Sequence, residues 1–315
     1  MRRIKWGKCI TKMFLALVMT SSLVVISGCE GVTGSKDIPL TPVISNPAVS
    51  TDGVLRVGVD TTLPPYAGLF DGTIVGVDVD VAAALAEHLG LRLELVDTSG
   101  QSLDALLIEG AVDMVMDIEQ TGGSVIRGRQ IGPYIESGPA LFTIVRSSSA
   151  PEVDLASLVG TSIAAQRDSL SAWSLEEMIA VGTADPRETL DEAFGALVRG
   201  EVTYAAADAV VGSYLALEYD SISCVAMLGT PIGVYIGVAP ENIQLADALT
   251  QALRDIRDNG VLGTVISKWL GPVSASVVMG SSAITSQDTN GSTAVVDPDA
   301  PVDMGEDLPD PSNAG

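Results

Sequence analysis

Acidic, hydroxyl and aromatic side chains follow several short segments that the sequence predicts to be strands. These segments span residues 54–59, 112–116, 162–166 and 202–207. The side chains that follow them include Asp60, Tyr66, Asp117, Glu119, Arg167, Ser169 and Asp208. Ligands of open α/β sheets bind at the carboxyl ends of strands, so these residues form the candidate site. A buried ammonium needs a carboxylate partner, so an acidic rim suits a cationic ligand.

Other kinds of site find little support in the sequence. His88 is the single histidine, and it falls on an expected helix beside Leu89, where we interpret it as a surface residue. With one histidine and no acid cluster at ligand spacing, the sequence predicts no metal and no cofactor. No Ser-His-Asp arrangement can be assembled either. The net charge of −23 argues against nucleic-acid partners, and 4% aromatic residues leave little surface for stacking.

The first candidate residues lie in a strand–loop–helix unit. Residues 54–59 form the strand, and Pro64 and Pro65 end it and hold the following loop extended. A short hairpin follows, and then a helix with Val81, Leu85 and Leu89 on one face. We expect Asp78 or Asp80 to cap the start of this helix.

Four segments carry a family resemblance. They read LRVGVDTTLPPY, DGTIVGVDVDVAAALAEHLG, ALVRGEVTYAAADAVVGSYLA and ALTQALRDIRDNGVLGTVISKWLG. Together they resemble the family 3 extracellular solute-binding proteins, which serve polar amino-acid ABC transporters, over about residues 53–271. The resemblance implies an α/β fold with two lobes, the type II periplasmic-binding-protein (Venus flytrap) architecture, joined by two hinge strands.

The expected domain organisation follows from composition and from that resemblance. We expect a signal peptide at 1–28, a tether at 29–52, a first lobe from 53–145 and 234–272, a second lobe at 146–233, and a disordered acidic tail at 273–315. The tail is rich in Ser, Thr, Gly, Pro and Asp and has no Lys or Arg after residue 272. It is therefore a cell-wall spacer, a partner-binding segment or a solvated tail without a specific role.

The N-terminus predicts membrane anchoring. Five basic residues precede a short apolar run, and Ile26-Ser27-Gly28-Cys29 matches a lipobox. Cleavage before Cys29 and lipidation of its thiol would hold the protein outside the cytoplasm, at the membrane. An uncleaved anchor helix is the alternative. Cys224 is then the one remaining cysteine, which we interpret as a core residue.

The resemblance also assigns roles to candidate residues. It implies that Asp208 pairs with a ligand ammonium, that Asp60 and Tyr66 contact the ligand from the first loop, and that Ser169 helps to bind a carboxylate. Plainer structural roles remain open at this point. Asp208 and Ser169 can each cap a helix, and Asp60 can cap the Pro-Pro loop. The aromatic at the position of Tyr66 is often structural in the family.

Several positions depart from the family pattern. The usual stacking aromatics are replaced by Leu63 and Gly100, and a glycine is replaced by Arg167. The segment that normally carries the carboxylate-binding arginine is shortened, so either Arg127 or Arg129 could fill that role. Asp117 and Glu119 stand where small polar residues are usual. These changes suit a basic amino acid or polyamine, or a site that has drifted away from amino acids.

The sequence therefore predicts a monomeric, non-enzymatic binding protein for a small polar, cationic or zwitterionic solute, an amino acid by family analogy, delivered to an ABC permease. Two alternatives remain. One is a sensory or scaffold lipoprotein with a degenerate site. The other is a dehydratase on the same fold, which would need an acid or base poised in the cleft.

Overall fold

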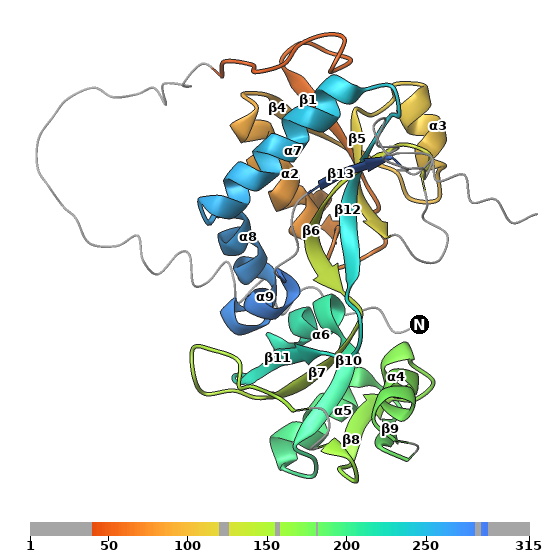
Figure 1. Ribbon diagram of the computed structural model, residues 1–315, viewed down its shortest axis with the longest axis vertical. Coiled ribbons are helices and arrows are strands. Elements are labelled where there is room, and N and C mark those ends of the chain that lie inside the picture. Colours follow the sequence, from red (N-terminus) through yellow and green to blue (C-terminus); the bar gives the residue numbers. More distant parts are fainter. Residues whose placement is uncertain (1–39, 120–125, 155–157, 181, 281–284, 289–315) are drawn as a thin grey trace, which may run out of the picture.

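The computed structural model describes residues 40–119, 126–154, 158–180, 182–280 and 285–288. They form two α/β lobes, one above the other in Figure 1. This confirms the predicted two-lobe fold. The expected signal peptide, Cys29 and most of the expected tail lie outside the described residues.

The larger lobe is built on a mixed sheet with β1 near one edge. The strand order is β13 (Thr285–Asp288), β6 (Arg129–Ser137), β12 (Ile232–Val238), β5 (Met114–Glu119), β1 (Val54–Val59) and β4 (Arg92–Asp97). β1 runs parallel to both neighbours, whereas β12 is antiparallel to β5 and β6. The carboxyl ends of β1, β4 and β5 therefore meet at one edge of the sheet, where ligands of such sheets bind.

The helices of this lobe are α2 (Val77–His88), α3 (Leu103–Ile108), α7 (Ile243–Asp258) and α8 (Val261–Leu270). α2, α7 and α8 pack together, while α3 lies against β5. The predicted apolar face of α7 is confirmed, because Leu245, Leu249 and Leu253 are fully buried. The predicted cap of α2 is wrong: Gly76 is its N-cap, and Asp78 and Asp80 lie in the first helical turn.

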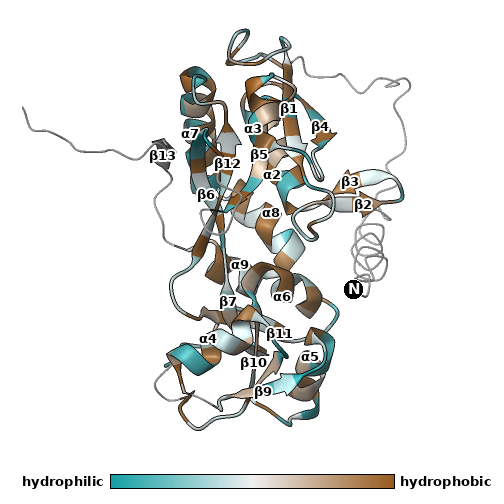
Figure 2. Ribbon diagram, turned by 90° about the vertical axis from the view of Figure 1, so that its right-hand side faces the viewer, coloured by the Kyte–Doolittle hydropathy of each residue, from teal (hydrophilic) through white to brown (hydrophobic). Residues whose placement is uncertain are grey.

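A small hairpin of β2 (Gly68–Phe70) and β3 (Thr73–Val75) precedes α2. Figure 2 shows it projecting from the larger lobe as a sheet of its own. It matches the short hairpin expected between the Pro-Pro loop and the helix.

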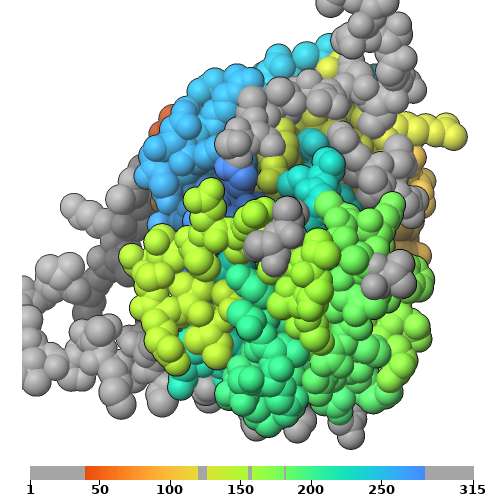
Figure 3. Space-filling model, turned by 60° about the horizontal axis from the view of Figure 1, so that its bottom comes forward, coloured from red at the N-terminus to blue at the C-terminus, as the bar shows by residue number. Residues whose placement is uncertain are grey.

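The smaller lobe has a second sheet. Its strand order is β11 (Ile222–Met227), β7 (Pro139–Ile144), β10 (Tyr204–Asp208), β8 (Ile163–Gln166) and β9 (Ala184–Arg187). α4 (Leu170–Met178) covers one face, and α5 (Leu190–Arg199) and α6 (Ala209–Ala216) cover the other. The rings of Phe142 and Phe194 pack with centroids 5.2 Å apart in its core. Figure 3 shows this lobe in green in front of the blue helices of the larger lobe.

The chain changes lobes earlier than the boundary expected at residue 145. β6 belongs to the larger sheet and β7 to the smaller one, so the crossing falls at Gly138. The return crossing lies between β11 and β12, before Ile232. β7 leaves the first lobe because it pairs with β10 and β11 along its full length.

Two segments that are predicted to be unstructured from their composition pack against the folded lobes. Residues 40–52 of the expected tether lie against the larger lobe, where Val49 is fully buried and Ser50 donates two hydrogen bonds to Asp113. Part of the expected tail forms α9 (Pro272–Val278), with Val273 and Val278 buried. The disordered tail and the free tether are therefore wrong for these residues, because apolar side chains in both segments find the core.

Within the described part of the chain, no single helix is long and apolar enough to cross a membrane. α8 and α9 meet the length and composition test only when taken together, and they are bent by 118° at Gly271. α9 packs on α8 and on β11, so it contacts both lobes. The backbone N–H of Cys224 in β11 donates to the Ser274 hydroxyl of α9 over 3.0 Å.

Candidate functional site

Asp60 begins the loop that leaves β1. Its Oδ1 accepts hydrogen bonds from the amide and hydroxyl of Thr62, at 2.8 and 2.6 Å, and from the Ser99 hydroxyl at 2.8 Å. Burial raises the pKa of Asp60, but the hydrogen bonds from Thr62 and Ser99 outweigh it and leave the pKa below its ordinary value. The hydrogen bonds therefore favour the ionised form of Asp60.

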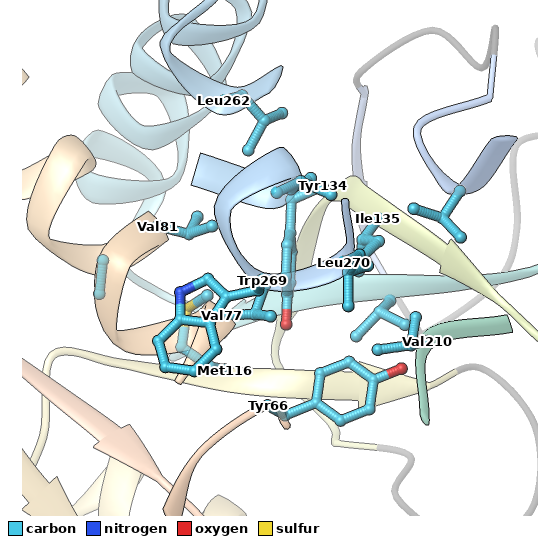
Figure 4. Packing of buried hydrophobic residues seen from close by; sticks show 14 of the residues in the cluster. Tyr66, Val77, Val81, Met116, Tyr134, Ile135, Val210, Leu262, Trp269 and Leu270 are labelled. Carbon is cyan, nitrogen blue, oxygen red and sulfur yellow. The ribbon is translucent and has the colours of Figure 1, made fainter. Parts of the chain in front are cut away.

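Tyr66 ends the same loop and lies in the cleft between the lobes. The backbone of α2 holds it there, because the amide of Asp78 donates to the Tyr66 carbonyl at 3.0 Å. Gly76 is required for this approach, since a Cβ there would collide with that carbonyl oxygen. Figure 4 shows the hydroxyl end of Tyr66 turned toward Val210 of α6. Burial, followed by the charges of Asp208 and Asp117, raises the pKa of Tyr66 well above its ordinary value.

Asp117 lies at a bulge in β5. Ile118 pairs with Tyr235 and Val115 with Gly237, so two residues of β5 face one residue of β12. Asp117 adopts φ 60°, a left-handed conformation that is uncommon outside glycine. The bulge turns its carboxylate out of the strand alternation and into the cleft, where Oδ1 is buried without a hydrogen-bond donor in the described residues.

The carboxylates near Asp117 are crowded. Burial, and then the charges of Asp78, Glu119, Asp60 and Asp208, raise the pKa of Asp117 well above its usual range. Burial, and then the charge of Asp208, raise the pKa of Glu119. Ionisation of these neighbouring carboxyl groups is therefore unfavourable. A positively charged ligand in the cleft would make it more favourable.

Asp78 and Tyr134 form a buried layer beneath Asp117. The Tyr134 hydroxyl donates to Oδ1 of Asp78 over 2.6 Å, and Asp78 is 1% exposed. Burial raises the pKa of Asp78 to about 7, although the bond from Tyr134 lowers it. Figure 4 shows Tyr134 beside Trp269 and Val77. The layer is sealed from the cleft, and it acts on the site through its charge.

Two cavities open beside these residues. The larger is about 480 Å³ and is lined by Asp60, Leu63, Thr98, Gly100, Gln101, Ser102, Leu103, Asp104, Met116, Asp117 and Ile126. The smaller is about 230 Å³ and is lined by Leu63, Pro64, Tyr66, Asp117, Glu119 and Val211. Leu63 and Asp117 line both, so the two cavities adjoin. Val211 belongs to α6, so the smaller cavity lies between the lobes.

The candidate residues of the smaller lobe are engaged in the fold. Oδ1 of Asp208 accepts from the amides of Val210 and Val211 at 3.0 and 2.8 Å, and Oδ2 accepts from the Ser137 hydroxyl at 2.8 Å. Ser169 caps α4 by accepting from the amide of Ala172. In both cases the structure shows the helix-capping role that was the alternative to ligand contact.

The candidate arginines line neither cavity. Arg167 is exposed and pairs with Glu188, with its Nη2 at 3.1 Å from the carboxylate. Arg129 donates to the Pro240 carbonyl at 3.0 Å. Arg127 is exposed, and its backbone amide donates to Asp104 at 2.9 Å. Of the predicted site residues, Asp60, Tyr66, Asp117 and Glu119 line the cavities, whereas Arg127, Arg167, Ser169 and Asp208 do not.

Sequence reasoning missed part of the lining. Leu63 and Gly100, the positions where stacking aromatics are absent, both line the larger cavity. Gln101, just before the cap of α3, and Asp104, in its first turn, were not predicted. The polar run directly after β4 is the signal that indicates Gln101. Among the residues that the structure describes, no three His, Cys, Asp or Glu side chains converge as a metal site.

A pair of α/β lobes with an acidic cavity between them defines a two-lobed ligand-binding protein. The model of the bacterial extracellular solute-binding proteins, family 3, matches residues 55–272, and the chain belongs to that family. The match ends at Pro272, so most of α9 lies beyond it.

Two curated relatives align with about 70% of this chain. The chain is 25% identical over 224 residues to the probable ABC transporter arginine-binding protein ArtJ of Chlamydia trachomatis, covering 68% of this chain and 84% of the relative. It is 24% identical over 240 residues to the L-arginine-binding protein of Pseudomonas aeruginosa, covering 72% and 92%. The unliganded, open L-cystine solute receptor of Neisseria gonorrhoeae superposes with a TM-score of 0.57 at 20% identity, covering 70% and 93%.

Proposed function

We propose that this protein is the lipid-anchored binding component of an ABC importer. It holds a small polar amino acid or a related cationic solute between its lobes and delivers it to a permease in the membrane. Lipidation of Cys29 keeps the protein outside the cytoplasm, and it works as a monomer without catalysing a reaction. The names of the two arginine-binding relatives support a cationic amino acid as the family-typical ligand.

One observation carries this proposal, the cavity shared by the two lobes. Tyr66, Asp117 and Glu119 approach it from the larger lobe, and Val211 from the smaller one. A solute held there would contact both lobes, so binding favours a closed arrangement over an open one. The acidic lining selects against anions.

The test is thermal unfolding and calorimetry of the full-length chain against amino acids and polyamines. A ligand at about 100 times its Kd should stabilise the fold by about 2.7 kcal/mol. Chromatography of the mixture should return the solute unchanged. No stabilisation by any member of the panel would contradict the proposal.

A pair of matched variants places the binding site. Val211→Trp puts a bulky side chain at the smaller cavity and should abolish binding. Val198→Trp makes the same change on the exposed face of α5, away from both cavities, and should leave binding intact. Equal effects of the two variants would place the ligand elsewhere.

A further inference from the structure

The two adjoining cavities form a track with carboxylates along it. Asp60, Asp104 and Asp117 line the larger cavity, and Asp117 and Glu119 line the smaller. The larger cavity alone falls within the range of about 300–1,000 Å³ that is typical of small-molecule sites. An elongated ligand can therefore meet negative charge at more than one point along its length.

Asp117 supplies an independent indication of a ligand. Its Oδ1 is buried and has no hydrogen-bond donor among the described residues. A buried carboxylate oxygen without a donor lowers the free energy of unfolding. The left-handed backbone of Asp117 lowers it as well. Asp117 lines both cavities, so its side chain borders a ligand bound in either one.

Among the described residues, neither cavity is lined by a cationic side chain that would pair with a ligand carboxylate. Every Lys and Arg after residue 39 falls within the described ranges, and none of them lines either cavity. The amides at the start of α6 are already engaged by Asp208. The carboxylate of an amino acid would instead lie among like charges, which costs free energy.

We propose that the cleft binds a linear di- or polyamine without a carboxylate, with one ammonium on Asp117 and others along the acidic track. This inference rests on the proposed function and narrows its ligand class. The ammonium groups donate to Asp117, to Asp60 or Asp104 in the larger cavity, and to Glu119 in the smaller one. The methylene chain lies against Leu63, which lines both cavities. A flat aromatic ligand gains nothing here, because Leu63 and Gly100 offer no stacking surface.

Calorimetry of the full-length chain with three matched pairs tests the proposal. The pairs are lysine and cadaverine, ornithine and putrescine, and arginine and agmatine, each differing by one carboxylate. The decarboxylated member should bind at least tenfold more tightly in every pair, and spermidine should bind as well. Tighter binding of the amino acids overturns this inference and leaves the proposed function standing.

The remaining outcomes are also decisive. If neither member of any pair binds, and spermidine does not bind, both this inference and the proposed function fail for these solutes. If magnesium or calcium chloride binds and no amine does, the acidic track is a metal site and the inference is overturned.

Asp117→Asn tests the central contact. Asparagine tolerates a left-handed backbone, so the bulge should persist while the charge is lost. Affinity for cadaverine should fall at least tenfold. The matched control is Asp71→Asn, another aspartate with positive φ (48°), which is exposed and lines neither cavity. It should change affinity less than twofold.

Glu119→Gln keeps the test decisive if Asp117→Asn fails to fold. It should weaken cadaverine binding at least threefold, with an unchanged circular dichroism spectrum. An unchanged affinity in a folded Asp117→Asn or Glu119→Gln variant would overturn the proposal.

Discussion

The two rims of the cleft use their carboxylates differently. On the larger lobe, Asp117 presents a buried oxygen that nothing in the described residues satisfies. On the smaller lobe, Asp208 has both carboxylate oxygens engaged, by α6 and by Ser137. The carboxylate on the larger lobe, Asp117, lacks a hydrogen-bond donor for one oxygen, whereas the carboxylate on the smaller lobe, Asp208, stabilises the fold.

The difference separates two roles that the same residue type can play. A carboxylate at a helix N-terminus is stabilised by the amides and by the helix dipole, so it favours the folded state. A buried carboxylate without donors opposes folding unless a ligand supplies the missing positive charge. In our proposal, the larger lobe is therefore the side that recognises the charge of the ligand, and the smaller lobe completes the cavity through Val211.

Asp208→Ala should produce the largest change in stability. It removes the cap of α6 and leaves the Ser137 hydroxyl without its acceptor. A lost N-cap costs about 0.5–2 kcal/mol, and hydrogen bonds to charged groups contribute about 1.5–3 kcal/mol. We expect the free energy of unfolding to fall by about 3 kcal/mol in urea titrations.

Asp117→Asn is the matched test on the other rim. It removes a charge that burial disfavours, so the free energy of unfolding should stay level or rise at pH 8. We assign ligand contact to Asp117 and a stabilising role to Asp208. This assignment is contradicted if Asp208→Asn abolishes ligand binding while leaving the unfolding curve unchanged. That result would give Asp208 the ligand contact that the family resemblance implies.

Asp78→Asn should alter how stability depends on pH. Burial raises the folded-state pKa of Asp78 from 3.8 to about 7, so its contribution to stability is fully present below about pH 4 and is lost as the pH rises through 7. Asparagine cannot ionise, yet its oxygen still accepts from Tyr134. Between pH 4 and 8, the wild type should lose more than about 1 kcal/mol relative to the variant, since one pKa unit corresponds to about 1.4 kcal/mol.

Urea unfolding at several pH values measures this difference. Asp71→Asn is the matched control, because that aspartate is exposed and its curve should run parallel to the wild type. If the wild-type and Asp78→Asn curves also run parallel, Asp78 is not ionising in this range. The buried layer would then contribute no charge to the larger rim.

Much of the fold is predictable because it is periodic. The strand at 54–59 has the bounds that its β-branched composition predicted, and the apolar face of α7 follows its four-residue spacing. Pairing within each lobe then follows from the usual geometry of α/β units. These features depend on neighbours in the sequence, which the sequence displays directly.

α9 and residues 40–52 could not be predicted in the same way. Both are rich in small residues, and their few apolar side chains show no sustained period. Val49 and Val278 become buried only because the rest of the molecule offers a surface for them. Composition marks such segments as unstructured when the stabilising contacts come from distant elements.

The site was partly predictable for a related reason. A position at a strand end is a local property, and it indicated Asp60, Asp117 and Glu119. The bulge that turns Asp117 depends on its register with β12, which no local pattern encodes. The capping role of Asp208 was visible as an alternative, since a short helix follows it directly.

Arg167→Ala should have the smallest effect. Arg167 and Glu188 form an ion pair in which both side chains are mostly exposed, 52% and 72%. Exposed pairs contribute less than about 1 kcal/mol, because water screens the charges and the side chains lose entropy. The free energy of unfolding should change by less than that amount, and the affinity for cadaverine by less than twofold.

The Arg167→Ala variant also tests whether the smaller lobe contributes a charged group to ligand binding. Arg167 follows β8 at the end of the smaller lobe where Ser169 begins α4, so a closing motion could bring it toward a ligand. A guanidinium facing the cleft would bind a carboxylate and repel a diamine. If Arg167→Ala weakens amino-acid binding tenfold, the smaller rim does recognise charge, and the division of roles between the lobes is overturned.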